Sequence, residues 1–512
     1  MKVPVLPFLI IGAVLFNSCS NDLKNERETK PNIIFIMSDD HANKAVSAYN
    51  EGLLETPNID RIANEGILFK NAFVTNSICA PSRAVILTGK YSHLNGVTGN
   101  EQVFDGGQVT FPKLLQKNGY NTALIGKWHL KSSPTGFDYW NILPHQGEYY
   151  KPDFIEMGKD TIYDGYVTDV ITQLALDWLE NKAIDKPFCL VMQHKAPHRS
   201  WMPSQKNLDL FNDKEFILPD NFYDNYENRL ALKRQTLTIR NHMDIAWDFK
   251  VPCDTCEVST LYPWALEAYY SRLDRLTDKE LERWNEAYKN EEEKFYELFN
   301  GDTLDFDQWK YQRYMEDYLR CIVSVDESVG KILDYLEATG QDKNTMIIYT
   351  SDQGFYLGEH GLFDKRFMYE ESLRTPMVMR FPSEIRPGEK SELMVQNLDI
   401  APTLLDLAGI EVPKDMQGLS LRKIWKEEYE GWRDAIYYHY YEDNFGATPH
   451  YGIRTDRYKL IHFYGPIDSW ELYDLKNDPT EMKNLYAALK NGSIVLELKK
   501  KLDSLREQYK ET

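Results

Sequence analysis

Short apolar runs that end abruptly in polar residues recur along the chain. Four of them lie at 32–37, 122–126, 188–192 and 345–350. Runs of this length, rich in β-branched residues, are typical of parallel strands that are buried on both faces. Helical patterns occur between them, at 57–63, 111–118 and 166–181. This alternation predicts an α/β domain with a large mixed, mostly parallel sheet sandwiched by helices.

The pattern changes after about residue 430. Alternating segments joined by tight turns predict antiparallel strands at 435–441, 451–455 and 458–463, and an amphipathic helix closes the chain at 494–509. We therefore expect a smaller C-terminal α+β domain, 431–512, beside a larger domain, 31–430. Segment 204–310, which is rich in charged residues, Tyr and Trp and helical at 278–299, is predicted to be an insertion that lines the active cleft. A dimerisation surface is the alternative.

The N-terminus has the features of an export signal. Met1-Lys2 precede an apolar run that ends at Phe16 and is too short to span a bilayer. Phe16-Asn17-Ser18-Cys19 resembles a bacterial lipobox, in which Cys19 would be lipidated after cleavage. We expect a signal peptide at 1–19, a polar tether at 20–30 and a lipid anchor, as in a periplasmic or cell-surface lipoprotein of a Gram-negative bacterium. A plain cleaved signal or a short anchor is the alternative.

Length and charge limit the classes of function. The 512 residues exceed the usual size of one simple core, which agrees with two domains. The formal net charge of −20 argues against nucleic acid as a partner, because a negative surface repels phosphate polymers. An anionic substrate would need a locally basic pocket. Cys253-x-x-Cys256 is interpreted as a structural disulfide or two free thiols, and Cys189 as a core residue.

Acidic and amide side chains follow two of the predicted strands. Asp39 and Asp40 come directly after the first run, and Asp352 and Gln353 after the last. In open α/β sheets, the carboxyl ends of the strands converge on one crevice. These four residues offer only oxygen ligands, which suit a hard cation. Calcium tolerates irregular geometry better than magnesium, so the sequence predicts one calcium ion.

Candidate cations and histidines lie in the same positions relative to the strands. Lys127 and His129 are spaced i, i+2, so an extended segment would direct both to the same side. Arg83 lies four residues after Cys79, about one helical turn away. His198 and Lys365 lie beyond later strands and are candidates for contacting a leaving oxygen. Most single lysines and arginines are solvated surface charges, and only their position after apolar strands favours a functional role.

One motif is more specific than the rest. Cys79-Ala80-Pro81-Ser82-Arg83, followed by Leu87-Thr88-Gly89, has the spacing C-x-P-S-R-x-x-x-L-T-G, which resembles the signature of type I sulfatases of the alkaline phosphatase-like superfamily. Alone, the five-residue run is equally consistent with a buried thiol at the head of a helix that begins with proline. Further segments resemble successive motifs of that family in the same order: 32–40, 119–129, 196–198, 351–354, Lys365 and 369–370.

The resemblance implies a nucleophile and a set of roles. Cys79 would be oxidised to formylglycine by a sulfatase-maturating enzyme, and its hydrate would attack sulfur and later expel sulfate as the aldehyde re-forms. The resemblance further implies that Cys79 joins Asp39, Asp40, Asp352 and Gln353 at the calcium ion. The family often has Asn or His where this chain has Gln353. The other implied roles are stabilisation of the nucleophile by Arg83 and Lys127, a hydrogen bond from His129, sulfate binding by Lys365 and proton donation by His198.

The substrate is suggested by three further segments. Residues 194–199, 354–371 and 470–484 look most like N-acetylglucosamine-6-O-sulfatases that act on glycosaminoglycans. The resemblance implies a sulfated carbohydrate substrate, with His194 and His450 as candidate sugar contacts. The alternatives are a sulfatase for another sugar position, a phosphatase or phosphonate hydrolase of the same superfamily, or a glycan-binding surface lipoprotein without activity.

Overall fold

A computed structural model describes residues 1–4, 30–49, 52–183, 185–253, 262–299 and 303–511. The predicted lipobox with Cys19 and nearly all of the tether lie outside the described residues, so the lipid anchor stays a prediction. Cys253 is disulfide-bonded, whereas Cys256 lies outside the described residues. Among the described residues, no helix has both the length and the apolar character that crossing a bilayer requires.

A ten-stranded sheet forms the centre of the molecule, and its four middle strands are parallel. They are β9 (Thr345–Ser351), β1 (Asn32–Ser38), β8 (Phe188–Gln193) and β4 (Asn121–Lys127), in that spatial order. Beyond β9 lie β10 (Met377–Arg380), β2 (Ile67–Phe69) and β11 (Glu389–Ser391). Beyond β4 lie β5 (Tyr139–Leu143), β6 (Asp153–Glu156) and β7 (Lys159–Ile162).

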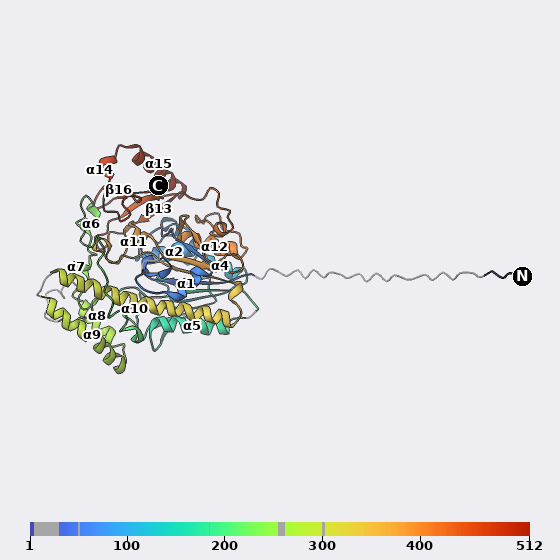
Figure 1. Ribbon diagram of the computed structural model, residues 1–512, viewed down its shortest axis with the longest axis horizontal. Helices are drawn as coiled ribbons and strands as arrows, with labels where there is room; N and C mark the ends of the chain where they lie inside the picture. Colours follow the sequence, from blue (N-terminus) through green and yellow to red (C-terminus); the bar gives the residue numbers. More distant parts are fainter. Residues whose placement is uncertain (5–29, 50–51, 184, 254–261, 300–302, 512) are drawn as a thin grey trace.

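Helices cover both faces of this sheet (Figure 1). Side chains of β1 alternate between two cores: Ile34 and Ile36 face one, and Ile33 and Phe35 face the other. The first core includes α1 (Pro57–Asn64), α5 (Val167–Asn181) and α10 (Thr303–Ala338). The second includes α2 (Cys79–Thr88), α4 (Phe111–Lys117) and α12 (Ile400–Leu407). The predicted sandwich is thereby confirmed.

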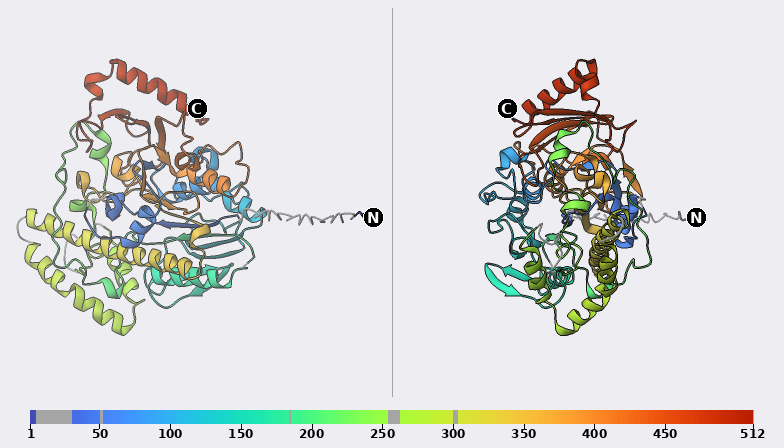
Figure 2. Two further views of the ribbon diagram at one scale, coloured as in Figure 1. Left: turned by 45° about the vertical axis from the view of Figure 1, so that its right-hand side comes forward. Right: turned by 90° about the vertical axis from the view of Figure 1, so that its left-hand side faces the viewer.

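A separate antiparallel sheet follows near the C-terminus (Figure 2). Its four strands are in sequence order: β13 (Ala435–Tyr440), β14 (His450–Thr455), β15 (Tyr458–Phe463) and β16 (Ser469–Asp474). Helix α15 (Ser493–Gln508) packs on it through Val495, Leu498 and Leu502, which share a core with Tyr437 and Leu460. The predicted α+β arrangement of this region is confirmed.

The segment between β8 and β9 is mostly helical. It contains α6 (Leu230–Arg234), α7 (Ile239–His242), α8 (Ala265–Leu273) and α9 (Asp278–Leu298). Thr277 and Glu280 form a capping box at the start of α9. Short elements elsewhere are β3 (Ala72–Phe73), α3 (Ser92–Asn95), α11 (Glu370–Leu373), β12 (Val395–Gln396), α13 (Arg422–Trp425) and α14 (Tyr486–Leu489).

The end of β4 shows why a glycine precedes Lys127. Gly126 has φ +106°, and a Cβ added there would overlap the carbonyl oxygen of Gln193 on the neighbouring β8. Gly119, in the turn before β4, has φ +90° but nothing within 4 Å of the added atom. An added Cβ would therefore cause backbone strain at both glycines, but steric overlap only at Gly126.

We predict that Gly126→Ala lowers the free energy of unfolding by about 3 kcal/mol, since left-handed strain and overlap between β4 and β8 add. Gly119→Ala, the matched control, should lower the free energy of unfolding by only about 1 kcal/mol, because it introduces backbone strain without steric overlap. Chemical denaturation of both variants measures the difference. Equal losses for the two variants would contradict the close approach of β4 and β8.

Candidate active site

Three carboxylates meet at the carboxyl ends of the central strands. Asp39 and Asp40 follow β1, and Asp352 follows β9. Because Ser38 pairs with Ser351, the chain register places the two acidic segments side by side. All three side chains are buried, and one oxygen of each lies within 4.8 Å of the others.

Each carboxylate is paired with a cationic side chain. Lys127, the last residue of β4, donates to Asp39, and Lys365 Nζ donates to both oxygens of Asp40 at 2.6 and 2.7 Å. The guanidinium of Arg83, on α2, donates to Asp352 Oδ2 at 2.9 and 3.1 Å. All six side chains are at most 5% exposed. Such buried charges are tolerated only because they are paired and hydrogen-bonded.

Crowding separates the pKa values of the three carboxylates. Burial raises the pKa of Asp39, but nearby positive charge, chiefly that of Lys127, outweighs burial and holds the pKa well below its usual value. Burial, opposed by Lys365 and reinforced by Asp39, raises the pKa of Asp40 to about 6. Burial and the charge of Asp39 raise the pKa of Asp352 to about 7. Burial and like charge thus raise the pKa of Asp40 and Asp352, because the nearby cations do not fully compensate for them.

This donor set fits a hard divalent cation. Asp39, Asp40 and Asp352 offer anionic oxygens within one small volume. Gln353 donates from its amide nitrogen to Asp40, and its amide oxygen is buried without a hydrogen-bond partner in the described structure. A buried, unsatisfied amide oxygen beside three carboxylates is suited to coordinating a metal ion.

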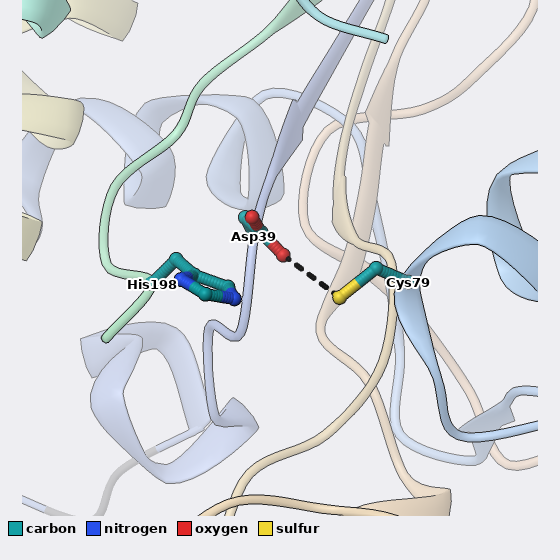
Figure 3. A group of neighbouring side chains, drawn as sticks. All are labelled: Asp39, Cys79 and His198. Carbon is teal, nitrogen blue, oxygen red and sulfur yellow. Dashed lines mark hydrogen bonds between the residues drawn. The ribbon is translucent and has the colours of Figure 1, made fainter. Parts of the chain in front are cut away.

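Cys79 begins helix α2 beside these groups (Figure 3). Its thiol donates to Asp39 Oδ1 at 3.4 Å and lies 3.8 Å from the amide nitrogen of Gln353. Burial, together with the charge of Asp39, raises the pKa of the thiol well above its ordinary value. An unmodified Cys79 would therefore be a protonated thiol and a poor nucleophile.

His198 lies across from Cys79 and points toward it, with Asp39 between them (Figure 3). Its Nδ1 lies 2.5 Å from the carbonyl oxygen of Arg199, which fixes Nδ1 as the donor. Nε2 then faces Asp40, with Oδ2 3.9 Å away. Burial and the charge of Lys127 hold the pKa of His198 well below its usual value, so the ring is neutral in this environment.

Arg83 has a wider role in the site than the sequence indicated. Besides Asp352, its Nη1 donates to the carbonyl oxygen of Lys127 and to Gln193 Oε1, both at 2.7 Å. One guanidinium therefore ties the ends of β4 and β8 to the residue that follows β9. Gln193 was not predicted as a site residue, since nothing in an apolar run that ends in glutamine indicates which side chain it will bind.

His129 and a residue that the sequence analysis missed form one side of the site. Gln146, in the loop after β5, accepts from Lys127, and its amide nitrogen donates to His129 Nε2 at 3.1 Å. Burial, with the charges of Lys127 and Arg83, holds the pKa of His129 well below its usual value. Lys195 donates to the main-chain carbonyl oxygen of Gln146 at 3.2 Å. Burial, together with the charge of nearby Arg272, lowers the pKa of Lys195 to about 7.

Two predicted sugar contacts are wrong. His194 is fully buried, and its Nε2 lies 3.3 Å from Ser328 Oγ on α10, so the ring faces the helical layer. His450 is also fully buried: its ring lies against those of Phe367 and Phe463, and its Nδ1 lies 2.7 Å from the Thr448 carbonyl oxygen. Both histidines are enclosed by protein on all sides, so neither side chain can contact a sugar.

Backbone strain is concentrated around the same groups. Asp40 (φ 67°), His129 (φ 56°), Asp364 (φ 74°) and Arg366 (φ 92°) all adopt the left-handed region, which non-glycine residues rarely do. Asp364 and Arg366 flank Lys365 on either side, and each pairs with the other at 3.0 Å. Strained conformations of this kind persist where surrounding contacts over-determine them, and they cluster at functional sites.

Comparisons with known proteins agree with this geometry. The sulfatase family model matches residues 31–410, and the model of the C-terminal region of N-sulphoglucosamine sulphohydrolase matches 358–508. The chain is 46% identical to an N-acetylglucosamine-6-O-sulfatase of Bacteroides thetaiotaomicron, over 99% of this chain and 92% of that protein. It is 27% identical to the human N-acetylglucosamine-6-sulfatase, over 82% of this chain and 69% of that protein.

A solved structure is similar over nearly the whole chain. It is described as a complex with its substrate D-glucosamine-2-N,6-O-disulfate, and it is 47% identical in sequence. The TM-score is 0.90, and the match covers 94% of this chain and 99% of that one. The fold is therefore that of the alkaline phosphatase-like sulfatases.

Proposed function

This chain belongs to the sulfatase family and is a sulfuric ester hydrolase, and we propose that it removes the 6-O-sulfate of N-acetylglucosamine in glycosaminoglycan fragments. The single observation that carries the proposal is the buried charge cluster at the head of α2, where Cys79 meets three paired carboxylates. The substrate assignment is supported by the 46% identity to an N-acetylglucosamine-6-O-sulfatase and by the 47% identical protein solved with a 6-O-sulfated glucosamine.

Two lysines are placed to bind the sulfuryl group. Burial lowers the pKa of Lys365, but Asp40 outweighs burial and raises the pKa well above its ordinary value, so Lys365 stays a cation. Lys127 is fully buried and donates to Asp39. Fixed cations in a water-excluded site stabilise the negative charge that grows on the attacked and leaving oxygens.

The proposed proton donor to the leaving oxygen is His198. Its Nδ1 is held by the Arg199 carbonyl, which leaves Nε2 as the atom that faces the site. Protonation at Nε2 requires a higher pKa than the buried ring has beside Lys127. An anionic substrate placed next to the ring would raise that pKa, because a negative charge favours the imidazolium.

We propose that Cys79 is modified to formylglycine, whose hydrate supplies the nucleophilic hydroxyl. The raised pKa of the buried thiol supports this, because it argues against a thiolate nucleophile. We further propose that Asp39, Asp40, Asp352 and Gln353 hold one calcium ion, which would stabilise the ionised hydroxyl and one sulfate oxygen. The crowded carboxylates and the unpartnered amide oxygen of Gln353 support that assignment.

The test of substrate is a sulfate-release assay on defined monosaccharides that carry 6-, 4-, 3- or 2-linked esters. We expect release from 6-O-sulfated N-acetylglucosamine and none from the same sugar with Cys79→Ala, since that variant has no nucleophile. Intact-mass measurement of the active protein should show Cys79 converted. Preference for another linkage, faster cleavage of aryl phosphate than of aryl sulfate, or full activity of the variant would each overturn the proposal.

Lys365→Ala should raise the barrier by about 3 kcal/mol, which is roughly a 10²-fold loss of kcat/KM, because a charge aimed at the sulfuryl group is removed. Lys331→Ala is the matched control, because Lys331 lies half-exposed on α10 and pairs with Asp169. That control should keep full activity. A Lys365→Ala enzyme within threefold of the unaltered protein would exclude Lys365 from sulfate binding.

Calcium should raise the midpoint of thermal unfolding of chelator-treated protein, since an ion that binds only the folded state stabilises it by about 2.7 kcal/mol at a hundredfold excess over Kd. Magnesium should shift it less, because it needs a regular octahedron. Asp352→Asn should lose the calcium response, whereas the exposed Asp164→Asn should keep it. No response in the unaltered protein would argue against a calcium site.

A further inference from the structure

A large cavity lies next to the reaction centre, on the side of β5 and β6. Its volume is about 950 Å³, which is within the range of ~300–1,000 Å³ typical of small-molecule sites. Its lining includes His129 and Gln146, which contact each other and, through Gln146, Lys127. The cavity therefore borders Gln146, which contacts one of the lysines proposed to bind sulfate.

A second residue connects the cavity to the head of α2. Asn100 lines the cavity, and its side-chain oxygen accepts from the main-chain nitrogen of Ala80 at 3.1 Å. Ala80 directly follows Cys79. The cavity therefore borders the reaction centre at two points, beside the nucleophile position through Asn100 and beside Lys127 through Gln146.

The floor of the cavity is apolar and includes one partly exposed indole. Ile142 on β5 pairs directly with Ile155 on β6, and Trp140 lies two residues before Ile142, on the same face of the sheet. The indole of Trp140 and the side chain of Ile155 are only partly buried, and both pack against the core behind them. A flat aromatic ring beside aliphatic side chains suits the C–H face of a sugar ring.

The rim is polar and carries both signs of charge. Glu101 and Lys131, which are exposed, form an ion pair at 2.6 Å, and Asp160 and His145 also line the cavity.

We propose that this cavity binds the sugar residue that is glycosidically linked to the sulfated one, with Trp140 as its stacking platform. The inference rests on the proposed function, because it assumes a carbohydrate sulfate ester in the reaction centre. The mixed charge of the rim and the partly exposed indole of Trp140 favour a hydroxylated, weakly charged ring over an apolar group or a protein surface. Trp140 and the apolar floor then determine the preference for chain length and leave cleavage of a single sugar unaffected.

The experiment compares 6-O-sulfated N-acetylglucosamine with a disaccharide in which that residue is linked to a second sugar. The unaltered protein should have a higher kcat/KM on the disaccharide. Trp140→Ala should lower kcat/KM on the disaccharide about tenfold, through KM, and leave the monosaccharide unchanged, because only the second sugar loses its stacking surface. Unchanged monosaccharide turnover also shows that the variant is folded.

Two further variants keep the test decisive. Trp140→Phe retains a smaller ring and should lose about threefold on the disaccharide alone, so it decides the matter if Trp140→Ala does not fold. Trp264→Ala is the matched control, because Trp264 is 51% exposed on the segment between β8 and β9, packs edge-to-face against Trp247 and does not line this cavity. It should leave both substrates unaffected.

The outcomes separate the two proposals. Equal turnover of both substrates by the unaltered protein, or equal losses on both with Trp140→Phe, would overturn the sugar-binding cavity and leave the proposed function intact. A selective disaccharide loss with Trp264→Ala in place of Trp140→Ala would place the second sugar on the segment between β8 and β9 instead. Failure to release sulfate from either sugar would overturn the proposed function itself.

Discussion

The pairing of buried carboxylates with buried cations is the constraint on which the rest of the site depends. Asp39, Asp40 and Asp352 are paired with Lys127, Lys365 and Arg83, and a single unpaired member would leave a charge in a place where solvent cannot compensate it. The same pairing determines what the site can bind. If a divalent cation neutralised the carboxylates, Lys127 and Lys365 would be available to an anionic group instead.

Arg83 connects this arrangement of charges to the strands of the central sheet. Its donors reach the ends of two parallel strands and the carboxylate that follows a third, so α2 can dock in only one position. Helix α2 begins at Cys79, and Ser82, three residues later, donates to the carbonyl of Asp352 and accepts from Asn397. The contacts of Ser82 and Arg83 thus hold Cys79 in position relative to the carboxylates.

The sequence predicted those parts of the structure that depend on local pattern. The central strands were located because apolar runs buried on both faces have no polar interruption, and Asp39 and Asp352 were placed together because parallel strands end at one edge. Gln146, Gln193 and Lys195 were missed, because their roles depend on contacts between segments that no spacing encodes. His194 was misplaced because a histidine after a strand can turn toward either layer, and His450 because it is the first residue of β14, where its side chain is fully buried. Helix α10 crosses the boundary predicted at 310, because it packs against α7 and α9 of the predicted insertion as well as against α1 and α5.

The distribution of charge explains how a strongly acidic chain can act on an anionic ester. With a net charge of −20, the surface as a whole repels sulfated polymers, so attraction has to be local and at short range. Lys127, Lys365 and Arg83 provide it in a site nearly closed to water, where charge interactions are screened far less than at the surface. Recognition beyond the sulfuryl group must then come mainly from uncharged contacts. The cavity beside His129 fits that requirement, because its floor is apolar and its exposed lysine is already paired with Glu101.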